Sequence, residues 1–280
     1  MDALPLALCN EVLQPLGFER QCALAAGLGY QGLEVAPFTL AADPVAISDG
    51  EARNFARVAA DHGLAITGLH WLLVAPAGLS IVSSEAAVRR RTTAAMERLV
   101  ELCAAMGGRY LVHGSPKQRS VPAGDSRDAA RERALECFAQ AARAAGRCGV
   151  TYCVEPLAPA ETDFINTVAE GIQIVDAIGS PAFRTMLDCS AAGQAEAEPV
   201  DALIRRWWPT GKLAHVQLND PNRRAPGQGT MRFAPILAAL REVGYRGVLA
   251  VEPFDYVPDG PGCAARAIGY LRGVMESMHG

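Results

Sequence analysis

Residues 215–229 read HVQLNDPNRRAPGQG, and the first half of this segment alternates between polar and apolar side chains. The polar members of the alternation are His215, Gln217 and Asn219. Val216 and Leu218 fall between them. Alternation of this kind is typical of a β-strand, with the two kinds of side chain on opposite faces. The apolar face suits the wall of a core, so we expect the polar face to line a part of the protein that requires polar groups.

Seven further segments have the length and composition of buried strands, and longer amphipathic stretches separate them. The eight strand candidates are 4–10, 32–38, 65–73, 109–116, 150–157, 183–190, 213–220 and 247–254. Neighbouring candidates are spaced by about 35 residues, as repeated strand–helix units require. The clearest helix candidates are 85–105, 127–145, 168–178, 233–242 and 264–278. Thr167 and Glu170 predict a capping box at one helix start, and Gly146 predicts the end of the helix over 127–145.

These alternating elements predict a single (β/α)8 barrel domain over residues 1–280, since such barrels typically hold about 250 residues. A doubly wound open sheet is the alternative fold. That fold is expected to carry a glycine-rich phosphate-binding turn after its first strand. The segment CNEVLQPLG at residues 9–17 follows the first strand candidate and lacks such a turn, which favours the barrel.

The composition favours a cytoplasmic protein. Half of the 280 residues are hydrophobic and the formal net charge is −4, which argues against nucleic acid as the main partner. No segment approaches about 18 uninterrupted apolar residues, so no contact with a membrane is predicted, and the N-terminal stretch lacks the pattern of a signal peptide. The eight cysteines form no CxxC pair and are expected to be reduced thiols. Trp207 and Trp208 predict either packing or a contact between subunits of a homo-oligomer, and this choice stays open.

A polar or ionisable residue stands at the end of seven of the eight strand candidates. These residues are Glu34, His70, His113, Glu155, Asp188, His215 with Gln217, and Glu252. In a barrel of parallel strands the carboxyl-terminal ends of the strands meet at one face, where catalytic groups are found. A single charged residue at a strand end is usually a loop anchor, but this whole set predicts one shared polar pocket.

Three carboxylates of this set come from strand candidates five, six and eight. They are Glu155, Asp188 and Glu252. Buried carboxylates raise each other's pKa unless a cation compensates. Because carboxylate and amide oxygens suit a hard divalent ion, these residues with Gln217 predict a site for one Mn²⁺ or Mg²⁺ ion. We therefore expect Gln217 to point into the barrel mouth, His215 to lie one layer deeper and Asn219 to lie above.

The segments that carry these residues resemble the xylose isomerase-like TIM barrel superfamily. They are VEPLAPAETDFINT at 154–167, TMLDCS at 185–190, HVQLNDPNRRAPGQG at 215–229 and VEPF at 251–254. The superfamily includes tagatose and psicose 3-epimerases, hydroxypyruvate isomerase, inosose-processing enzymes, 3-dehydroshikimate dehydratases and endonuclease IV. The resemblance covers nearly the whole chain. It implies a TIM barrel enzyme that uses one divalent ion and acts on a small sugar, ketose or related keto-hydroxy substrate.

Position by position, the resemblance implies a set of four metal ligands. They are Glu155, Asp188, Gln217 and Glu252. Glu161 and Arg223, each six residues after one of these ligands, match positions that contact substrate in the epimerases. Glu34 and His70 match polar positions that line the pocket. His113 and His215 complete the residues predicted to bind substrate.

Two departures from the family pattern bear on the reaction. The third ligand is usually His in the ketose 3-epimerases, whereas Gln217 is more similar to hydroxypyruvate isomerase and some dehydratases. The His that follows the Asp ligand by three residues and contacts substrate in the epimerases is replaced by Ala191. In endonuclease IV the same His ligates zinc, and the later Asp-x-His pair is also missing, which argues against a three-zinc repair site.

The predicted chemistry is proton transfer beside a carbonyl through an enediolate, with the ion polarising the C–O bond. Glu155 and Glu252 are the predicted catalytic pair, because they stand on opposite sides of such an ion and can remove and return a proton. Arg223 is expected to hold a substrate oxygen. Two alternatives stay open: a dehydratase that expels a β-hydroxyl with the same ion and base, and a catalytically weak sugar-binding barrel.

Overall fold

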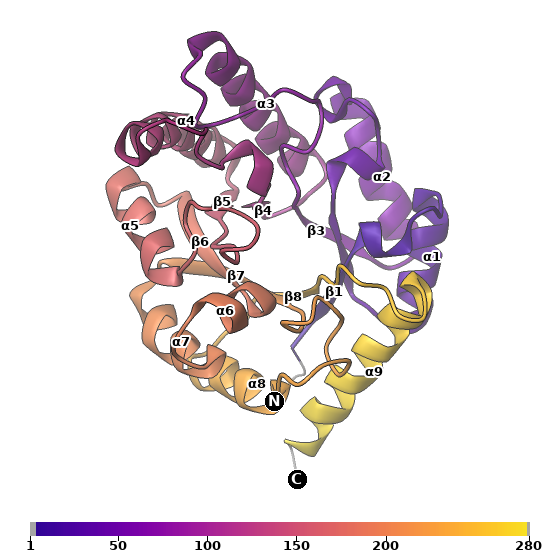
Figure 1. The fold of residues 1–280 in the computed structure, drawn as a ribbon. Helices are drawn as coiled ribbons and strands as arrows, with labels where there is room; N and C mark the ends of the chain where they lie inside the picture. Colours follow the sequence, from indigo (N-terminus) through magenta and orange to yellow (C-terminus); the bar gives the residue numbers. More distant parts are fainter. Residues whose placement is uncertain (1–3, 279–280) are drawn as a thin grey trace.

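The structure is a computed structural model that describes residues 4–278, and within this range eight parallel strands close into a barrel surrounded by helices (Figure 1). The strands are β1 (Leu6–Cys9), β2 (Gly32–Val35), β3 (Ala65–Leu69), β4 (Tyr110–His113), β5 (Thr151–Val154), β6 (Phe183–Asp188), β7 (Leu213–Leu218) and β8 (Leu249–Val251). Each strand pairs with its neighbours in sequence, and β8 closes the ring on β1, with Leu249 opposite Leu6. The prediction of a (β/α)8 barrel is therefore confirmed.

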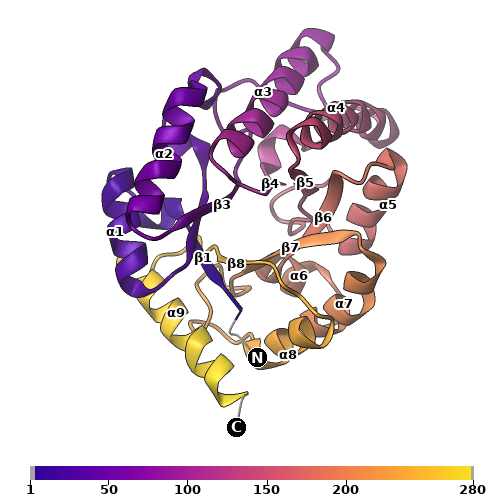
Figure 2. The same cartoon turned by 180° about the vertical axis from the view of Figure 1, so that it is seen from behind.

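The helices lie around the strands in both views of the molecule (Figures 1 and 2). They are α1 (Phe18–Leu28), α2 (Asp49–Asp61), α3 (Ala86–Ala105), α4 (Arg127–Cys148), α5 (Val168–Ile178), α6 (Cys189–Ala195), α7 (Val200–Trp207), α8 (Phe233–Glu242) and α9 (Gly260–Ser277). Within the described part of the chain, none of them combines the length and the apolar character that crossing a membrane requires.

Helix ends agree with the sequence where the capping signal is local. α5 and α8 begin and end at the predicted residues, and Thr167 and Glu170 form the predicted capping box. The predicted end of α4 at Gly146 is wrong. The helix continues until Gly149, which takes the left-handed conformation with φ 69°. Both positions are glycine, and the sequence does not distinguish the one that reverses the chain.

Every strand is shorter than its predicted segment, because the last residues of each segment turn into the following loop. β5 ends at Val154 and β8 ends at Val251, so Glu155 and Glu252 are the first residues beyond their strands. Asp188 is the last residue of β6 and also the N-cap of α6. These positions place three carboxylates at the carboxyl-terminal mouth of the barrel.

The apolar core lies mainly between the strands and the helices, and a smaller cluster fills the barrel itself. The inner cluster consists of Tyr110, Val112, Cys153 and Met186. A Cβ at Gly68 would lie only 2.5 Å from the ring of Tyr110, so glycine at this position allows the ring to occupy the barrel interior. Each fully buried large apolar side chain stabilises the fold by about 1.5–3 kcal/mol. The many such residues in these layers offset the cost of burying polar groups above them.

Candidate active site

Three carboxylates converge at the mouth of the barrel. One oxygen from each of Glu155, Asp188 and Glu252 lies within 4.8 Å of the oxygens of the other two. All three side chains are buried. The structure therefore brings together the three acidic residues that the sequence predicted as metal ligands.

Burial shifts the proton affinity of all three groups in the same direction. Burial, followed by the charges of Glu252 and Asp188, raises the pKa of Glu155 well above its usual value. Burial also raises the pKa of Asp188 to about 7 and that of Glu252 to about 8. A carboxyl group with a pKa near neutrality can both take up and release a proton at working pH. Without a cation this cluster therefore retains protons near neutral pH.

Hydrogen bonds fix the orientation of Asp188. Its Oδ1 accepts from the backbone N–H of Ala191 at 2.7 Å, which caps α6. Its Oδ2 accepts from Nδ2 of Asn219, also at 2.7 Å. The same Nδ2 donates to the backbone carbonyl of Glu252 at 2.9 Å. Asn219 thus lies above the cluster and holds β6 and the end of β8 together.

Two neighbours define the place of Glu155. The fully buried guanidinium of Arg119 donates to the backbone carbonyls of Glu155 and Ile165, so a cation lies directly behind the acidic cluster. A Cβ at Gly114 would lie 2.3 Å from Oε2 of Glu155, so the side chain of Glu155 has room only because residue 114 is glycine. The positions of both the backbone and the carboxylate of Glu155 are therefore determined by the loop after β4.

Gln217 supplies a fourth oxygen next to the cluster. It lies on β7, opposite Asp188 in the register of β6 and β7, and its Nε2 donates to Oε1 of Glu34 at 2.6 Å. Its Oε1 and the Oε2 of Glu252 are buried and have no hydrogen-bond partner among residues 4–278. Buried polar atoms normally have a partner, so these two oxygens call for one. Carboxylate and amide oxygens are the ligands of hard divalent ions, and the residues present fit Mn²⁺ or Mg²⁺.

The raised pKa values predict that the metal-free protein loses stability between about pH 6.5 and 8.5. An unfolded carboxyl titrates near pH 4, whereas Asp188 and Glu252 titrate near 7 and 8 in the folded protein. The folded state then binds more protons than the unfolded state. The contribution of Asp188 and Glu252 to the free energy of unfolding is therefore complete below about pH 4 and is lost as the pH rises through 7 and 8. The measurement is thermal unfolding in chelator across this range, and Mn²⁺ should restore stability at the alkaline end.

The predicted loss of stability begins at about pH 6.5, because below that pH the titration of His113 makes stability rise with pH. Burial lowers the pKa of this imidazole to about 3, so folding is favoured increasingly as the pH rises towards the unfolded value of about 6.5. A melting temperature that stays constant from pH 6.5 to 8.5 without metal would contradict the shared acidic pocket.

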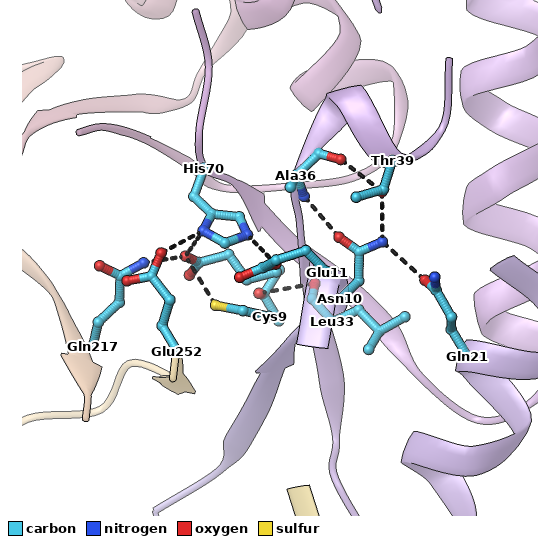
Figure 3. A network of polar contacts seen from close by, with 12 residues as sticks. Cys9, Asn10, Glu11, Gln21, Leu33, Ala36, Thr39, His70, Gln217 and Glu252 are labelled. Carbon is cyan, nitrogen blue, oxygen red and sulfur yellow. Dashed lines mark hydrogen bonds and ion pairs between the residues drawn. The ribbon is translucent and has the colours of Figure 1, made fainter. Parts of the chain in front are cut away.

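His70 bridges the cluster to a second acidic residue (Figure 3). It follows β3, and its Nδ1 lies 2.9 Å from Oε1 of Glu252 while its Nε2 lies 3.0 Å from Oε2 of Glu11. Glu11 belongs to the short helix η1 (Asn10–Leu13) after β1. Although burial lowers the pKa of His70, the carboxylates of Glu11 and Glu252 raise it well above its usual value. The contact with the imidazole holds Glu252 in place beneath the pocket.

Glu34 and His215 lie deeper in the barrel than the cluster and do not line the pocket. Nε2 of His215 lies 2.8 Å from Oε2 of Glu34, and the His215 ring stacks on Tyr110 with centroids 4.0 Å apart. The Tyr110 hydroxyl donates to the same carboxylate oxygen at 2.6 Å. The positions of Glu34 and His215 do not support the predicted direct contact with substrate, because Gln217 and the acidic cluster lie between them and the mouth.

The pocket itself is a small depression above Glu155 and Glu252. Trp71, Leu157 and Phe254 form its apolar walls, and the rings of Trp71 and Phe254 meet edge to face at 6.1 Å. Glu161 lines the mouth as predicted. Such a combination of apolar walls with a few convergent polar groups is typical of small-molecule sites.

Arg223 lies at the rim of this pocket. Its guanidinium donates to Glu161 at 3.0 Å and lies 4.6 Å from the ring centroid of Phe254. Its own carbonyl accepts from the N–H groups of Phe254 and Asp255 at 2.8 Å each. These contacts join the loops that follow β5, β7 and β8, so Glu161 and Arg223 lie where the sequence placed them.

The structure does not bring His113 to the site. Its ring meets Phe138 of α4 edge to face at 5.2 Å, and its Nδ1 lies 2.7 Å from the hydroxyl of Tyr152. His113 therefore points out of the barrel into the helix layer. The prediction that it contacts substrate is not supported by this position, because side chains alternate along β4 and Tyr110 and Val112 occupy the inward places.

Sequence reasoning missed several residues of the site. Trp71 and Phe254 line the pocket, and each lies one or two residues beyond a predicted strand-end residue. Glu11 lies in the stretch CNE at residues 9–11, directly after the first strand. It gives that strand a polar end group like those of the other seven, and this is the signal that could have identified it.

Residues 22–274 of this chain match the sequence model of one protein family, the xylose isomerase-like TIM barrels. A D-psicose 3-epimerase of Agrobacterium fabrum is 32% identical over 234 residues, which cover 82% of this chain and 76% of that protein. An L-ribulose 3-epimerase of Mesorhizobium japonicum is 30% identical over 217 residues, covering 76% of this chain and 69% of that protein.

Solved structures show the same fold. A D-psicose 3-epimerase from Clostridium cellulolyticum H10, solved with D-tagatose, superposes with a TM-score of 0.81 and 21% identity, covering 97% of this chain and 99% of that chain. At this level of identity the likeness concerns the fold alone.

Proposed function

The chain belongs to the xylose isomerase-like TIM barrel family, and on this basis and that of its acidic cluster we propose that it is a divalent-metal-dependent ketose epimerase or isomerase. Its relatives at 32% and 30% identity are D-psicose and L-ribulose 3-epimerases. The proposed reaction is proton transfer at a carbon beside a substrate carbonyl. Glu155 and Glu252 are the proposed proton carriers.

One observation carries the proposal. Glu155 and Glu252 directly follow β5 and β8, are both buried, and approach each other at the barrel mouth. Two carboxyls that can hold a proton on either side of one site are the groups needed to remove a proton from one face of a carbon and to return it to the other. The unpartnered oxygens of Gln217 and Glu252 beside them support an ion as the third component.

In the proposed mechanism the chain supplies proton carriers, orientation and exclusion of water. A bound divalent ion contributes positive charge that polarises the substrate carbonyl and lowers the barrier to proton loss. One of Glu155 and Glu252 takes the proton from the carbon, and the other delivers a proton to the opposite face. His70 and Asn219 keep Glu252 at its place during this exchange, through the imidazole contact and the bond to its backbone carbonyl.

The surroundings of the pocket support an uncharged, unphosphorylated substrate. Glu155, Glu161 and Glu252 line the pocket, and the guanidinium of Arg223 at its rim is already paired with Glu161. The glycine-rich loop after β7 is also occupied by a carboxylate. Asp220 accepts from the backbone N–H of Met231 at 2.8 Å, so this donor is already used and a phosphate would meet a negative charge there.

The direct test incubates the enzyme and Mn²⁺ with unphosphorylated ketohexoses, ketopentoses, keto acids and inososes, and identifies products by mass and NMR. The proposal expects a product of unchanged mass that differs in configuration or carbonyl position. Loss of water would instead identify a dehydratase. Binding of sugar without stoichiometric metal or turnover would identify a sugar-binding barrel.

Gln217→His is expected to keep divalent-metal binding but to change the preferred ion. An imidazole nitrogen replaces an amide oxygen, and nitrogen ligands favour Co²⁺ or Zn²⁺ over Mg²⁺. We expect the affinity ratio of Co²⁺ to Mg²⁺ to rise by about tenfold, equivalent to about 1.4 kcal/mol. Competition titration of both ions against wild type and variant measures this ratio. An unchanged ratio would show that residue 217 is not a ligand.

A further inference from the structure

Glu34 is the most completely partnered carboxylate in the barrel interior, although it does not reach the pocket. It lies on β2 and is fully buried. One oxygen receives the Tyr110 hydroxyl at 2.6 Å and lies 2.8 Å from Nε2 of His215. The other receives Nε2 of Gln217 at 2.6 Å. Three neighbours from two strands, β4 and β7, thus converge on one side chain.

The hydrogen bonds of Glu34 determine which end of the Gln217 amide faces it. Both oxygens of Glu34 act as acceptors, one from the Tyr110 hydroxyl and the other from Nε2 of Gln217, at 2.6 Å each. A carboxylate only accepts hydrogen bonds, and an amide has one donating and one accepting end. The NH2 group of Gln217 must therefore face Glu34, and its oxygen must face away.

The remaining side of Gln217 is the side of the acidic cluster. β7 lies between β6 and β8, and Gln217 is opposite Asp188 in the register. Its Oε1 is buried and accepts no hydrogen bond from any residue of the range 4–278. If the amide rotated by half a turn, its NH2 group would face the cation position and would repel an ion.

We propose that Glu34 is a positioning residue that locks the Gln217 amide with its oxygen towards the divalent ion, and so sets the affinity of the site for hard cations. This inference rests on the proposed function in one respect, that Gln217 is a ligand of the ion. Groups that orient a metal ligand typically contribute about 10–100-fold to metal affinity. An amide held in this way presents oxygen alone, which favours Mn²⁺ and Mg²⁺.

The test measures Mn²⁺ affinity of the full chain by isothermal titration calorimetry for wild type and Glu34→Gln. The new amide can donate to Oε1 of Gln217 and turn it away from the ion. We expect Mn²⁺ to bind about 10–100-fold more weakly. Tyr110→Phe is the matched control, since it removes one hydrogen bond from Glu34 but keeps the acceptor that faces Gln217. The loss of Mn²⁺ affinity in this variant should be clearly smaller than in Glu34→Gln.

A double-substitution cycle separates positioning from a general structural effect. In Gln217→Met there is no amide to orient, so adding Glu34→Gln should cause no further loss of Mn²⁺ affinity. An equal loss in both backgrounds would overturn the positioning role. If Glu34→Gln does not fold, Glu34→Asp serves instead, because it keeps the charge but withdraws the acceptor by one methylene and should also weaken binding.

The outcomes distinguish this inference from the proposed function. Wild-type affinity in Glu34→Gln, together with lost affinity in Asp188→Asn, would overturn the positioning role and leave the metal centre standing. Unchanged Mn²⁺ affinity in Asp188→Asn would overturn the metal centre, and the positioning role with it.

Discussion

The variant Glu252→Gln, assayed at saturating Mn²⁺, is expected to turn over substrate at least about 100-fold more slowly than the wild type. The amide has nearly the same size as the carboxyl group and retains one oxygen, but it does not take up a proton near neutral pH. That oxygen can still accept from Nδ1 of His70, which lies 2.9 Å from Oε1 in the wild type. The side chain therefore stays in place, and the loss should fall on kcat.

Solvent deuterium gives the decisive measurement for this variant. The wild type should introduce deuterium at the carbon beside the substrate carbonyl, and Glu252→Gln should not. Glu242→Gln is the matched control, because Glu242 is exposed and paired with Arg205 far from any proposed proton carrier. Exchange by Glu252→Gln at the wild-type rate would refute its acid–base role, whatever the family of the chain.

Asp188→Asn is expected to weaken Mn²⁺ binding by at least about 100-fold, since even groups that only orient a ligand contribute about 10–100-fold. Both oxygens of Asp188 already accept hydrogen bonds, from the N–H of Ala191 and from Nδ2 of Asn219. The NH2 group of an asparagine must face one of these two donors. The variant therefore loses a charged ligand and also disturbs the bonds that orient it.

Calorimetric titration of Mn²⁺ into the metal-free protein measures this loss. Asp255→Asn is the control, because it removes one negative charge at the exposed rim, where Asp255 pairs with Arg224. Exposed charges are screened by solvent and contribute little, so its affinity should remain close to that of the wild type. Equal affinities for Asp188→Asn and wild type would remove the basis for the metal centre.

The barrel and the acidic cluster could be predicted because both follow from local patterns. Period-two alternation in HVQLND marks the strand, and parallel strands that close into a ring bring their ends together. Thr167 and Glu170 determine the start of α5 through contacts within one helical turn. The convergence of Glu155, Asp188 and Glu252 needed no further information, since each stands at the end of a strand.

The orientation and depth of the remaining residues could not be read from strand ends alone. His113 is the last residue of β4, but the parity of the strand turns it towards α4. His215 faces inward two residues before Gln217, which places it about 6–7 Å lower along the strand. Arg119 is a loop residue whose burial depends on the loop after β5, far away in sequence. Such features are set by tertiary packing.

The carboxylate behind Gln217 has an evolutionary consequence. Glu34 accepts from the amide of Gln217 at 2.6 Å, and a carboxylate would accept equally from the ring N–H of a histidine at the same place. Glutamine and histidine codons differ only in their third base. A single point mutation can therefore exchange the two ligand types while their common acceptor stays unchanged. Lineages that keep this glutamate can change between amide and imidazole ligands without passing through an inactive intermediate sequence. Natural selection can therefore readily change the ion preference of the site.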